Sequence, residues 1–445
     1  MNKSKITIAT MAAAVMLAFA PSCSDNDIDP NRSSKAEKPY TPENTTALEK
    51  SKIAGKVTTT ENLWAPDGFN DFAAKVRQFS NKTATMMGIS SKGNTAVSPI
   101  SIFMALSMSA ECADNNTRKE LLDALGVTYQ ELTDNIQYLC YLCNKILSDD
   151  DENKVTNFIK CVNSLWISPR AVTKEEGVNS LTHYYYSDIF KIDTKSNINQ
   201  LIKSYVKNET RGLIDPDLEL SKDVELVLMN VVYLKDVWKR FGIDLDFTDK
   251  KYTFHNYDGS TTTTPLLLGE YRTGKMISTD TYRKFYTSTN GGLRLTFIIP
   301  NDNYTLDDVY TTDVLNQKDD YVYEDEEFIY QTRCLFPEFT AEYDGNISEI
   351  VRKMGVNDLF SRNKCDFSHI TDREVFCGPI QHVAKLEANR TGIEGAAMTM
   401  ICMDLASNME SKKEVFYDFV VDRSFAYVLT YQDVPLFTGV VKKVK

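Results

Sequence analysis

Apolar residues recur at helical spacing in several stretches of the chain. The first stretch predicts an amphipathic helix whose buried face carries Phe69, Phe72, Val76 and Phe79. The segment TRKELLDALG, residues 117–126, predicts a second helix that ends at Gly126. Residues 198–205 show the same periodicity and predict a third helix.

A strand that runs directly into a helix is predicted for residues 95–113. Ser98 stands where this helix would begin, and its hydroxyl is expected to cap the free N–H groups of the first turn. Pro99 follows at the first helical position, where its fixed φ suits the helix and no N–H is needed.

Other stretches have the pattern of strands. Residues 155–167 alternate between apolar and polar, and residues 224–234 form a continuous apolar, β-branched run typical of a strand buried on both faces. Three more strands are predicted near the end, at 293–300, 420–431 and 435–444. Helices and strands do not alternate strictly, so the sequence predicts an α+β fold with large, mixed but mostly antiparallel sheets.

The first residues have the pattern of an export signal. Lys3 and Lys5 precede an apolar run of about 15 residues, which is too short to cross a membrane comfortably. We therefore expect residues 1–22 to be a signal peptide, residues 23–66 a flexible polar tether and residues 67–445 one folded domain.

The end of this signal is similar to a bacterial lipobox, because the small residues Ala20, Pro21 and Ser22 precede Cys23. The resemblance implies that Cys23 is lipidated and anchors an exported lipoprotein at the outer membrane or cell surface. Ordinary cleavage and a soluble extracellular product is the alternative.

Composition narrows the possible functions. The 445 residues carry a net charge of -12, which argues against nucleic acid as a partner. The nine cysteines form no small disulfide framework, and Cys140 and Cys143 lie in an apolar run typical of buried thiols. The four histidines lack the spacing of a zinc site, so we expect no metal and no cofactor.

Six motifs, in order, make the chain similar to the serpin family from about Asp67 to Val444. The resemblance implies the serpin fold, with helices around large sheets and an exposed reactive loop. The motifs are NTAVSPISI at 94–102, VNSLW at 162–166, NETRGLI at 208–214, LVLMNVVYLKDVW at 226–238, MGVNDLF and CDFSHI within 354–370, and PLFTGVV at 435–441.

The resemblance also implies roles for residues within these motifs. One group matches the family's shutter, a polar cluster beneath the main sheet that can bond differently when the sheet opens. Trp238 matches the aromatic residue of the breach, where the loop first inserts. The shutter residues are Asn94, Ser98, Ser101, Asn230 and His382.

Residues 387–403 resemble the inhibitory hinge and the loop that follows it. Small residues dominate, as insertion into a sheet requires, and side chains alternate between two faces in a strand. The hinge consists of Gly392, Ile393, Glu394, Gly395, Ala396 and Ala397. The face to be buried would carry Ile393, Gly395, Ala397, Thr399, Ile401 and Met403, none of which is charged.

Two residues depart from the family pattern. Ile393 stands where the family has Thr or Ser, and Arg390 where it has Glu, which leaves open whether the loop traps a protease or is only cleaved. The family's spacing from Gly392 predicts cleavage between Ala406 and Ser407, which suits an elastase-like target. The loop is longer than usual, so Met409, Lys412 and Lys413 remain alternatives, the lysines implying a trypsin-like target.

The resemblance therefore implies a monomeric suicide inhibitor whose partner is a serine protease or, alternatively, a cysteine protease. A non-inhibitory serpin that acts as a binding protein is the second hypothesis. An enzyme that uses Ser98 is disfavoured, because the sequence around this residue lacks the G-x-S-x-G elbow of serine hydrolases.

Overall fold

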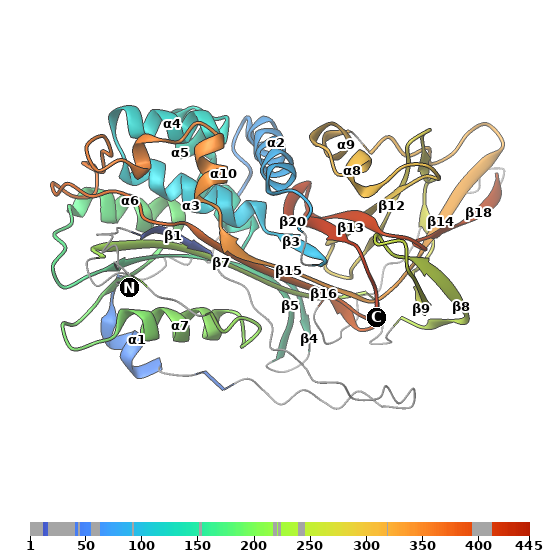
Figure 1. Ribbon diagram of the computed structural model, residues 1–445, viewed down its shortest axis with the longest axis horizontal. Coiled ribbons are helices and arrows are strands. Elements are labelled where there is room, and N and C mark those ends of the chain that lie inside the picture. Colours follow the sequence, from blue (N-terminus) through green and yellow to red (C-terminus); the bar gives the residue numbers. More distant parts are fainter. Residues whose placement is uncertain are drawn as a thin grey trace, which may run out of the picture.

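The computed structural model describes residues 12–16, 41–42, 45–54, 63–90, 93–150, 154–216, 220, 224–238, 245–317, 319–393 and 412–445. This part of the chain has three sheets with helices around them, so the predicted α+β class is confirmed (Figure 1). No helix in the described ranges is long and apolar enough to cross a membrane.

Within the described residues the largest sheet has nine strands, and its central path runs in the order β1, β16, β17, β7, β5, β6, β2. β15 pairs with β16, and β4 pairs with β5. Every residue of β7 is buried, as its continuous apolar sequence predicts. The strands are β1 (Ala12–Met16), β2 (Lys52–Ala54), β4 (Lys145–Asp150), β5 (Lys154–Ile167), β6 (Asp188–Lys191), β7 (Leu226–Val237), β15 (Phe339–Asn346), β16 (Gln381–Ala388) and β17 (Gly392–Ile393).

Two smaller sheets complete the strand framework. One has six strands in the order β11, β12, β13, β19, β20, β3, and the other has five, with β18 beside β14. The six-stranded sheet consists of β3 (Thr95–Val97), β11 (Ile277–Ser278), β12 (Tyr282–Ser288), β13 (Arg294–Pro300), β19 (Phe425–Tyr431) and β20 (Val434–Val441). The five-stranded sheet consists of β8 (Phe247–His255), β9 (Thr261–Leu268), β10 (Arg272–Thr273), β14 (Phe328–Phe336) and β18 (Lys413–Val420).

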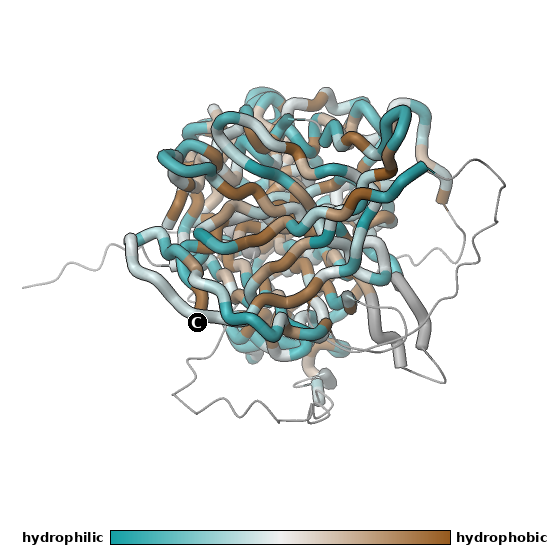
Figure 2. The backbone as a smooth tube through the Cα atoms, turned by 90° about the vertical axis from the view of Figure 1, so that its right-hand side faces the viewer, coloured by the Kyte–Doolittle hydropathy of each residue, from teal (hydrophilic) through white to brown (hydrophobic). Residues whose placement is uncertain are grey.

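Helices cover both faces of the largest sheet (Figure 1). In that view α2, α3, α4, α5 and α10 lie above it, and α1 and α7 lie below it. Seen from the end that carries β14 and β18, hydrophobic stretches gather inside the molecule and hydrophilic ones at its margin (Figure 2). The helices are α1 (Thr45–Ser51), α2 (Phe69–Met87), α3 (Pro99–Cys112), α4 (Asn115–Leu125), α5 (Tyr129–Leu142), α6 (Glu175–Tyr185), α7 (Ile198–Glu209), α8 (Leu306–Val309), α9 (Thr312–Asn316) and α10 (Ser348–Lys353), with a 3-10 turn at Asp358–Phe360.

Local sequence signals set the helix ends. Gly126 closes α4 in the left-handed region at φ 74°, and Thr128 opens α5 with a capping box completed by Glu131. Pro99 begins α3 as predicted. The predicted cap at Ser98 is wrong in its role: the residue stands at the N-cap, but its hydroxyl donates to the carbonyl of Leu436 instead, at 2.9 Å.

The stretch expected to be a tether contains some folded residues. α1 is followed by β2, which pairs with β6 at the edge of the largest sheet, and Leu48 of α1 is buried. Within the expected signal peptide, β1 pairs in parallel with both β16 and β7. A mature chain that begins at Cys23, as expected from the lipobox, lacks β1.

Candidate functional site: a strand gap with an inserted hinge

The chain reverses direction just after β16. Asn389 forms this turn, because its side-chain oxygen accepts from the backbone N–H groups of Thr391 and Gly392 at 2.9 and 3.2 Å. The backbone N–H of Asn389 also donates to the carbonyl of Gly392 at 3.1 Å. Asparagine is suited to such turns because its short amide can replace a backbone partner.

After the turn, Gly392 and Ile393 form β17, which lies between β16 and β7. Ile393 pairs with Ala388 on one side and with Asp236 on the other, and both pairings are antiparallel. A Cβ on residue 392 would lie 2.2 Å from the carbonyl oxygen of Asp236, so only glycine fits there. The side chain of Ile393 is 1% exposed, so the sheet accommodates this bulky departure from the family pattern.

Trp238 lies directly against the turn, as the resemblance implies for the breach. Its indole N–H donates to the carbonyl of Asn389 at 2.5 Å, and its ring contacts Phe336 edge-on with the centroids 5.3 Å apart. Trp238 is itself the residue after β7, so it connects that strand to the start of the loop.

Arg390, the second departure from the family pattern, lies on the exposed side of the turn. Its backbone N–H donates to a carboxylate oxygen of Glu338 at 2.8 Å, and its carbonyl accepts from the N–H of Leu245 at 2.9 Å. Its guanidinium lies 5.5 Å from the centre of the Phe247 ring. The surroundings of Arg390 therefore include a negative charge and an aromatic face, both of which suit a cation.

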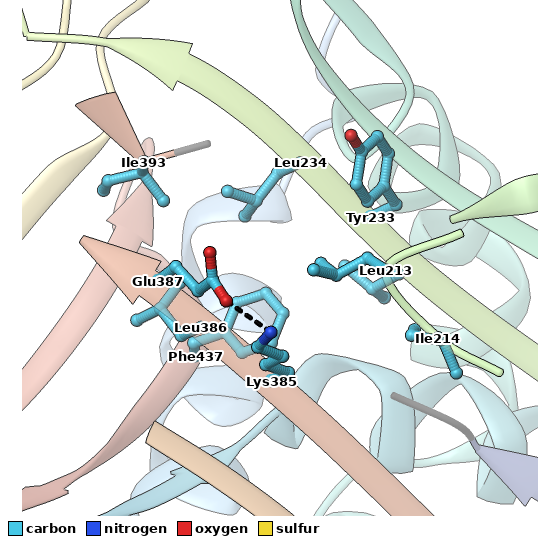
Figure 3. A pocket seen from close by; sticks show the side chains of 10 residues that line it. Leu213, Ile214, Tyr233, Leu234, Lys385, Leu386, Glu387, Ile393 and Phe437 are labelled. Atoms are coloured by element: carbon cyan, nitrogen blue, oxygen red, sulfur yellow. Dashed lines mark ion pairs between the residues drawn. The ribbon is translucent and has the colours of Figure 1, made fainter. Parts of the chain in front are cut away.

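A pocket lies ahead of β17, between β7 and β16 (Figure 3). It encloses about 330 Å³ of space, its mouth included. Its walls are largely apolar, and Lys385 and Glu387, both on β16, form an ion pair, drawn as a dashed line in Figure 3. The lining residues are Leu213, Ile214, Val232, Tyr233, Leu234, Lys385, Leu386, Glu387, Ile393 and Phe437.

Beyond the pocket the same gap holds a strand. β1 pairs there with β7 and β16, and Met16 is the backbone partner of both Asn230 and His382. Described strands therefore lie between β7 and β16 at both ends of this gap, at β17 and at β1, and among the described residues no strand pairs there between them.

A polar cluster lies beneath the gap, as the resemblance implies for the shutter. Ser101 of α3 donates its hydroxyl hydrogen to Oδ1 of Asn230 in β7. The amide of Asn230 donates to Oδ1 of Asn163 in β5 at 2.7 Å and to Sγ of Cys161 at 3.1 Å. The amide of Asn163 donates in turn to the carbonyl of Tyr185 at 2.8 Å, so the network crosses from helix to sheet to helix.

His382 completes the cluster from β16. Nε2 of its ring accepts from the backbone N–H of Ser98 at 3.2 Å. The side chain is fully buried, and this burial lowers the pKa of His382 to about 3, so the ring is neutral at physiological pH. A neutral ring that accepts at Nε2 carries its proton on Nδ1. Nδ1 has no hydrogen-bond partner in the described part of the chain.

Asn94 has different partners from the rest of the expected shutter. Its amide donates to the carbonyls of Thr340 and Lys443, at 3.0 and 2.9 Å. Its side-chain oxygen accepts from the N–H groups of Lys442 and Lys443, at 2.7 and 3.0 Å. Asn94 therefore joins β15 to the residues that follow β20.

Sequence reasoning missed two members of the site. Asn163 lies within the motif VNSLW, and an asparagine between the apolar pairs Cys161–Val162 and Leu165–Trp166 is the signal that could have identified it. Asp236 lies two residues before Trp238 and is 0% exposed. A carboxylate that closely follows a continuous apolar run was the corresponding signal.

Part of the predicted site lies outside the described residues: Cys23, Glu394, Gly395, Ala396, Ala397, Ala406, Ser407 and Met409. The two lysines at the far end of the loop are described. Lys412 donates to the carbonyl of Asp325 at 2.8 Å and pairs with Glu324 at 3.1 Å. Lys413 is the first residue of β18, and its N–H donates to the carbonyl of Glu327 at 3.0 Å.

The site thus combines a pocket between two strands of the main sheet, two loop residues paired at its end and a polar cluster beneath it. The model of the family described as Serpin (serine protease inhibitor) matches residues 70–444, so the chain belongs to the serpin family.

Relatives in sequence and structure agree with this assignment. Kallistatin from Pongo abelii is 27% identical over 331 residues, which cover 71% of this chain and 74% of that protein. Corticosteroid-binding globulin from Homo sapiens is 25% identical and covers 72% and 79%. The crystal structure of the thermophilic serpin tengpin in the native state has a TM-score of 0.67 at 19% identity, with 89% of this chain and 98% of that chain covered, and supports the fold alone.

Proposed function

We propose that this serpin is a suicide inhibitor of serine proteases rather than an enzyme. The observation that carries the proposal is β17: two loop residues already form a strand between β7 and β16. The pocket ahead of Ile393 is the space into which the following residues would move after a protease cleaves the loop. Each added residue would pair with the sheet on both sides, which supplies the driving force for insertion.

The register of β17 supports this path. If insertion continues from Ile393 in the same register, Thr399 arrives opposite Asn230 of β7 and opposite His382 of β16. Thr399 belongs to the uncharged face of the loop. We propose that its hydroxyl accepts from Nδ1–H of His382, which lacks a partner before insertion. Satisfying a buried donor is worth about 1–3 kcal/mol.

The mature protein would have this part of the gap free. The backbone partners proposed for Thr399 are the residues that pair with Met16 of β1. Removal of residues 1–22 during export would delete that strand. The same surfaces of β7 and β16 would then be available to the cleaved loop.

We propose the bond between Ala406 and Ser407 as the cleavage site, which suits an elastase-like protease. A protease must bind the loop as extended, unpaired backbone. The pairing of Lys413 in β18 and the ion pair of Lys412 with Glu324 disfavour cleavage after either lysine. The corresponding site after Met409 remains an alternative.

Incubation with an elastase-like and a trypsin-like protease tests the proposal. The expected product is a covalent complex that survives SDS. A C-terminal peptide should also be released, with the mass expected for a fragment that begins at Ser407. Complete cleavage by both enzymes without any stable complex would favour the second hypothesis, a non-inhibitory binding protein. The similarity to corticosteroid-binding globulin is the reason for considering this alternative.

We further propose that lipidation of Cys23 anchors the protein to a bacterial membrane. Support comes from the lipobox-like residues before Cys23. Substitution of Cys23 by Ser should move the protein from the membrane fraction to the soluble exported fraction. An unchanged membrane fraction would argue against the anchor.

A further inference from the structure

Asp236 is a buried carboxylate at the point where the hinge joins the sheet. It is 0% exposed, and its backbone pairs with Ile393 of β17. A carboxylate is rarely buried unless several donors surround it. Its position beside the hinge therefore requires a physical explanation.

The donors around Asp236 come from a turn in a different sheet. The hydroxyl of Thr289 donates to Oδ2, and the N–H of Gly291 lies 3.1 Å from Oδ1 and 2.9 Å from Oδ2. The backbone N–H of Val237 also donates to Oδ1 of Asp236, at 2.9 Å. The carbonyl of Val237 accepts from the N–H of Asn290 at 2.7 Å.

The turn that supplies these donors is stabilised by its own hydrogen bonds. The hydroxyl of Thr289 accepts from the N–H of Leu293 at 2.9 Å, and residues 289–293 connect β12 to β13 of the six-stranded sheet. The end of β7 is therefore fastened through one carboxylate to a sheet that does not contain the gap.

We propose that Asp236 is a positioning residue that holds the end of β7 at the spacing that keeps the hinge inserted. The inference rests on the proposed loop insertion and identifies the contact that prepares the sheet for it. Gly392 fits so closely against Asp236 and Val237 that a small shift of β7 would disrupt the pairing of β17. The position of the end of β7 therefore determines whether Gly392 and Ile393 stay in the sheet.

The charge of Asp236 does not explain its position. Burial raises the pKa of Asp236 to about 6, although the surrounding donors act in the opposite direction. A raised pKa means that the buried charge costs the folded protein free energy. The donors therefore fix where the carboxylate lies without making the burial of its charge favourable.

Few other titratable groups face Asp236. The phenol of Tyr431 in β19 does, and its pKa is raised by burial and by the charge of Asp236. The turn 289–293 contributes no titratable side chain, and neither do Ile393 or Ala388. Lys235 is adjacent along β7, and its side chain points to the opposite face of the strand.

Hydrogen–deuterium exchange of the peptide that spans residues 389–393 tests the proposal in the intact protein. D236N should speed exchange there by about tenfold or more at pH 7.5, since tenfold corresponds to one weakened charge-assisted contact. D344N is the matched control, because Asp344 is an exposed carboxylate on β15.

Unchanged protection in D236N would overturn the proposal. T289V keeps the carboxylate and removes one donor, so it provides a milder variant if D236N fails to fold. It should speed exchange of the same peptide relative to D344N, and unchanged protection in T289V would likewise overturn the proposal. The exchange measurement needs no protease, so it is independent of the test for inhibition. If the wild type forms no SDS-stable complex with a protease, the proposed inhibition is wrong. If the wild type forms the complex but residues 389–393 of D236N stay protected from exchange, only the role of Asp236 is wrong.

Discussion

Asn230 and Asn163 face each other across β7 and β5, and the amide of Asn230 donates to Oδ1 of Asn163 at 2.7 Å. Both side chains are buried beneath the gap into which the loop would insert. On the other side, Oδ1 of Asn230 accepts from the hydroxyl of Ser101 in α3. The strand that must allow insertion is thus held by directional bonds, which can re-form with new partners, as well as by apolar packing.

Asn163→Ala should destabilise the intact protein. The change leaves the carbonyl of Tyr185 without its donor and removes the oxygen that Asn230 contacts. Buried groups left unpaired cost about 1–3 kcal/mol, and urea unfolding at pH 7 should show a loss of that size. Gln130→Ala, which removes an exposed side chain of α5, should change the free energy by less than about 0.5 kcal/mol. Equal effects of the two substitutions would contradict a structural role for the network.

His382 should make the intact protein sensitive to acid. Its pKa is about 3 in the fold and 6.5 in an ordinary environment, so between these values only the unfolded chain binds the proton. The free energy of unfolding therefore falls as the pH drops below 6.5. Between pH 7 and pH 5 the loss from this group is about 2 kcal/mol.

His382→Gln separates this contribution from the others. Glutamine can still accept from the N–H of Ser98 and does not titrate. The difference in free energy of unfolding between wild type and variant should shrink by about 2 kcal/mol on going from pH 7 to pH 5. The comparison cancels the contribution of Asp236, which titrates in the opposite direction because its pKa is raised. A difference that does not change with pH would contradict the assignment.

Gly392→Ala should push the hinge out of the sheet. The new methyl group would lie 2.2 Å from the carbonyl oxygen of Asp236 and 2.8 Å from Cα of Val237, and both are backbone atoms. The variant should need several-fold more inhibitor per protease trapped, because insertion starts later relative to hydrolysis of the acyl-enzyme. Gly345→Ala in β15 is a control, since its nearest neighbour is the movable hydroxyl of Tyr343 at 3.1 Å. Equal trapping by both variants would refute the importance of a pre-inserted hinge.

Arg390→Glu should weaken the turn, because it places a second carboxylate beside Glu338, which already accepts from the N–H of residue 390. Both side chains are exposed, so the loss in free energy of unfolding should stay within about 1 kcal/mol. Combining it with Glu338→Gln removes the like charge and keeps an acceptor for the N–H of residue 390, so it should recover most of the loss in a double-mutant cycle. Purely additive effects would mean that the two side chains do not interact.

Much of the framework could be predicted from sequence because its signals are local. The apolar run of β7, the helical spacing around Phe72 and the glycine at 126 each specify an element without reference to the rest of the chain. The family resemblance pointed to His382, Asn230, Ser101 and Trp238. The structure brings Ser101 into contact with Asn230, His382 with Ser98, and Trp238 with Asn389, while the roles of these residues stay predictions.

The features that the sequence did not predict depend on contacts between segments that are distant along the chain. The hydroxyl of Ser98 bonds to Leu436, 338 positions away, and no local pattern indicates that this bond replaces a helix cap. The same holds for Asp236, whose burial becomes understandable only when Thr289 and Gly291 are seen around it. The fit of Ile393 was also unpredictable, because it depends on the spacing of β7 and β16.

The central claim is that the loop inserts into the main sheet, and thermal unfolding of intact and cleaved protein tests it most directly. A non-target protease nicks the loop between residues 394 and 411, and the melting temperatures of the two forms are compared. The account predicts that the nicked form melts tens of degrees higher, because the loop adds a fully paired strand and Thr399 reaches His382. Equal melting temperatures for the two forms would contradict insertion and with it the proposed mechanism of inhibition.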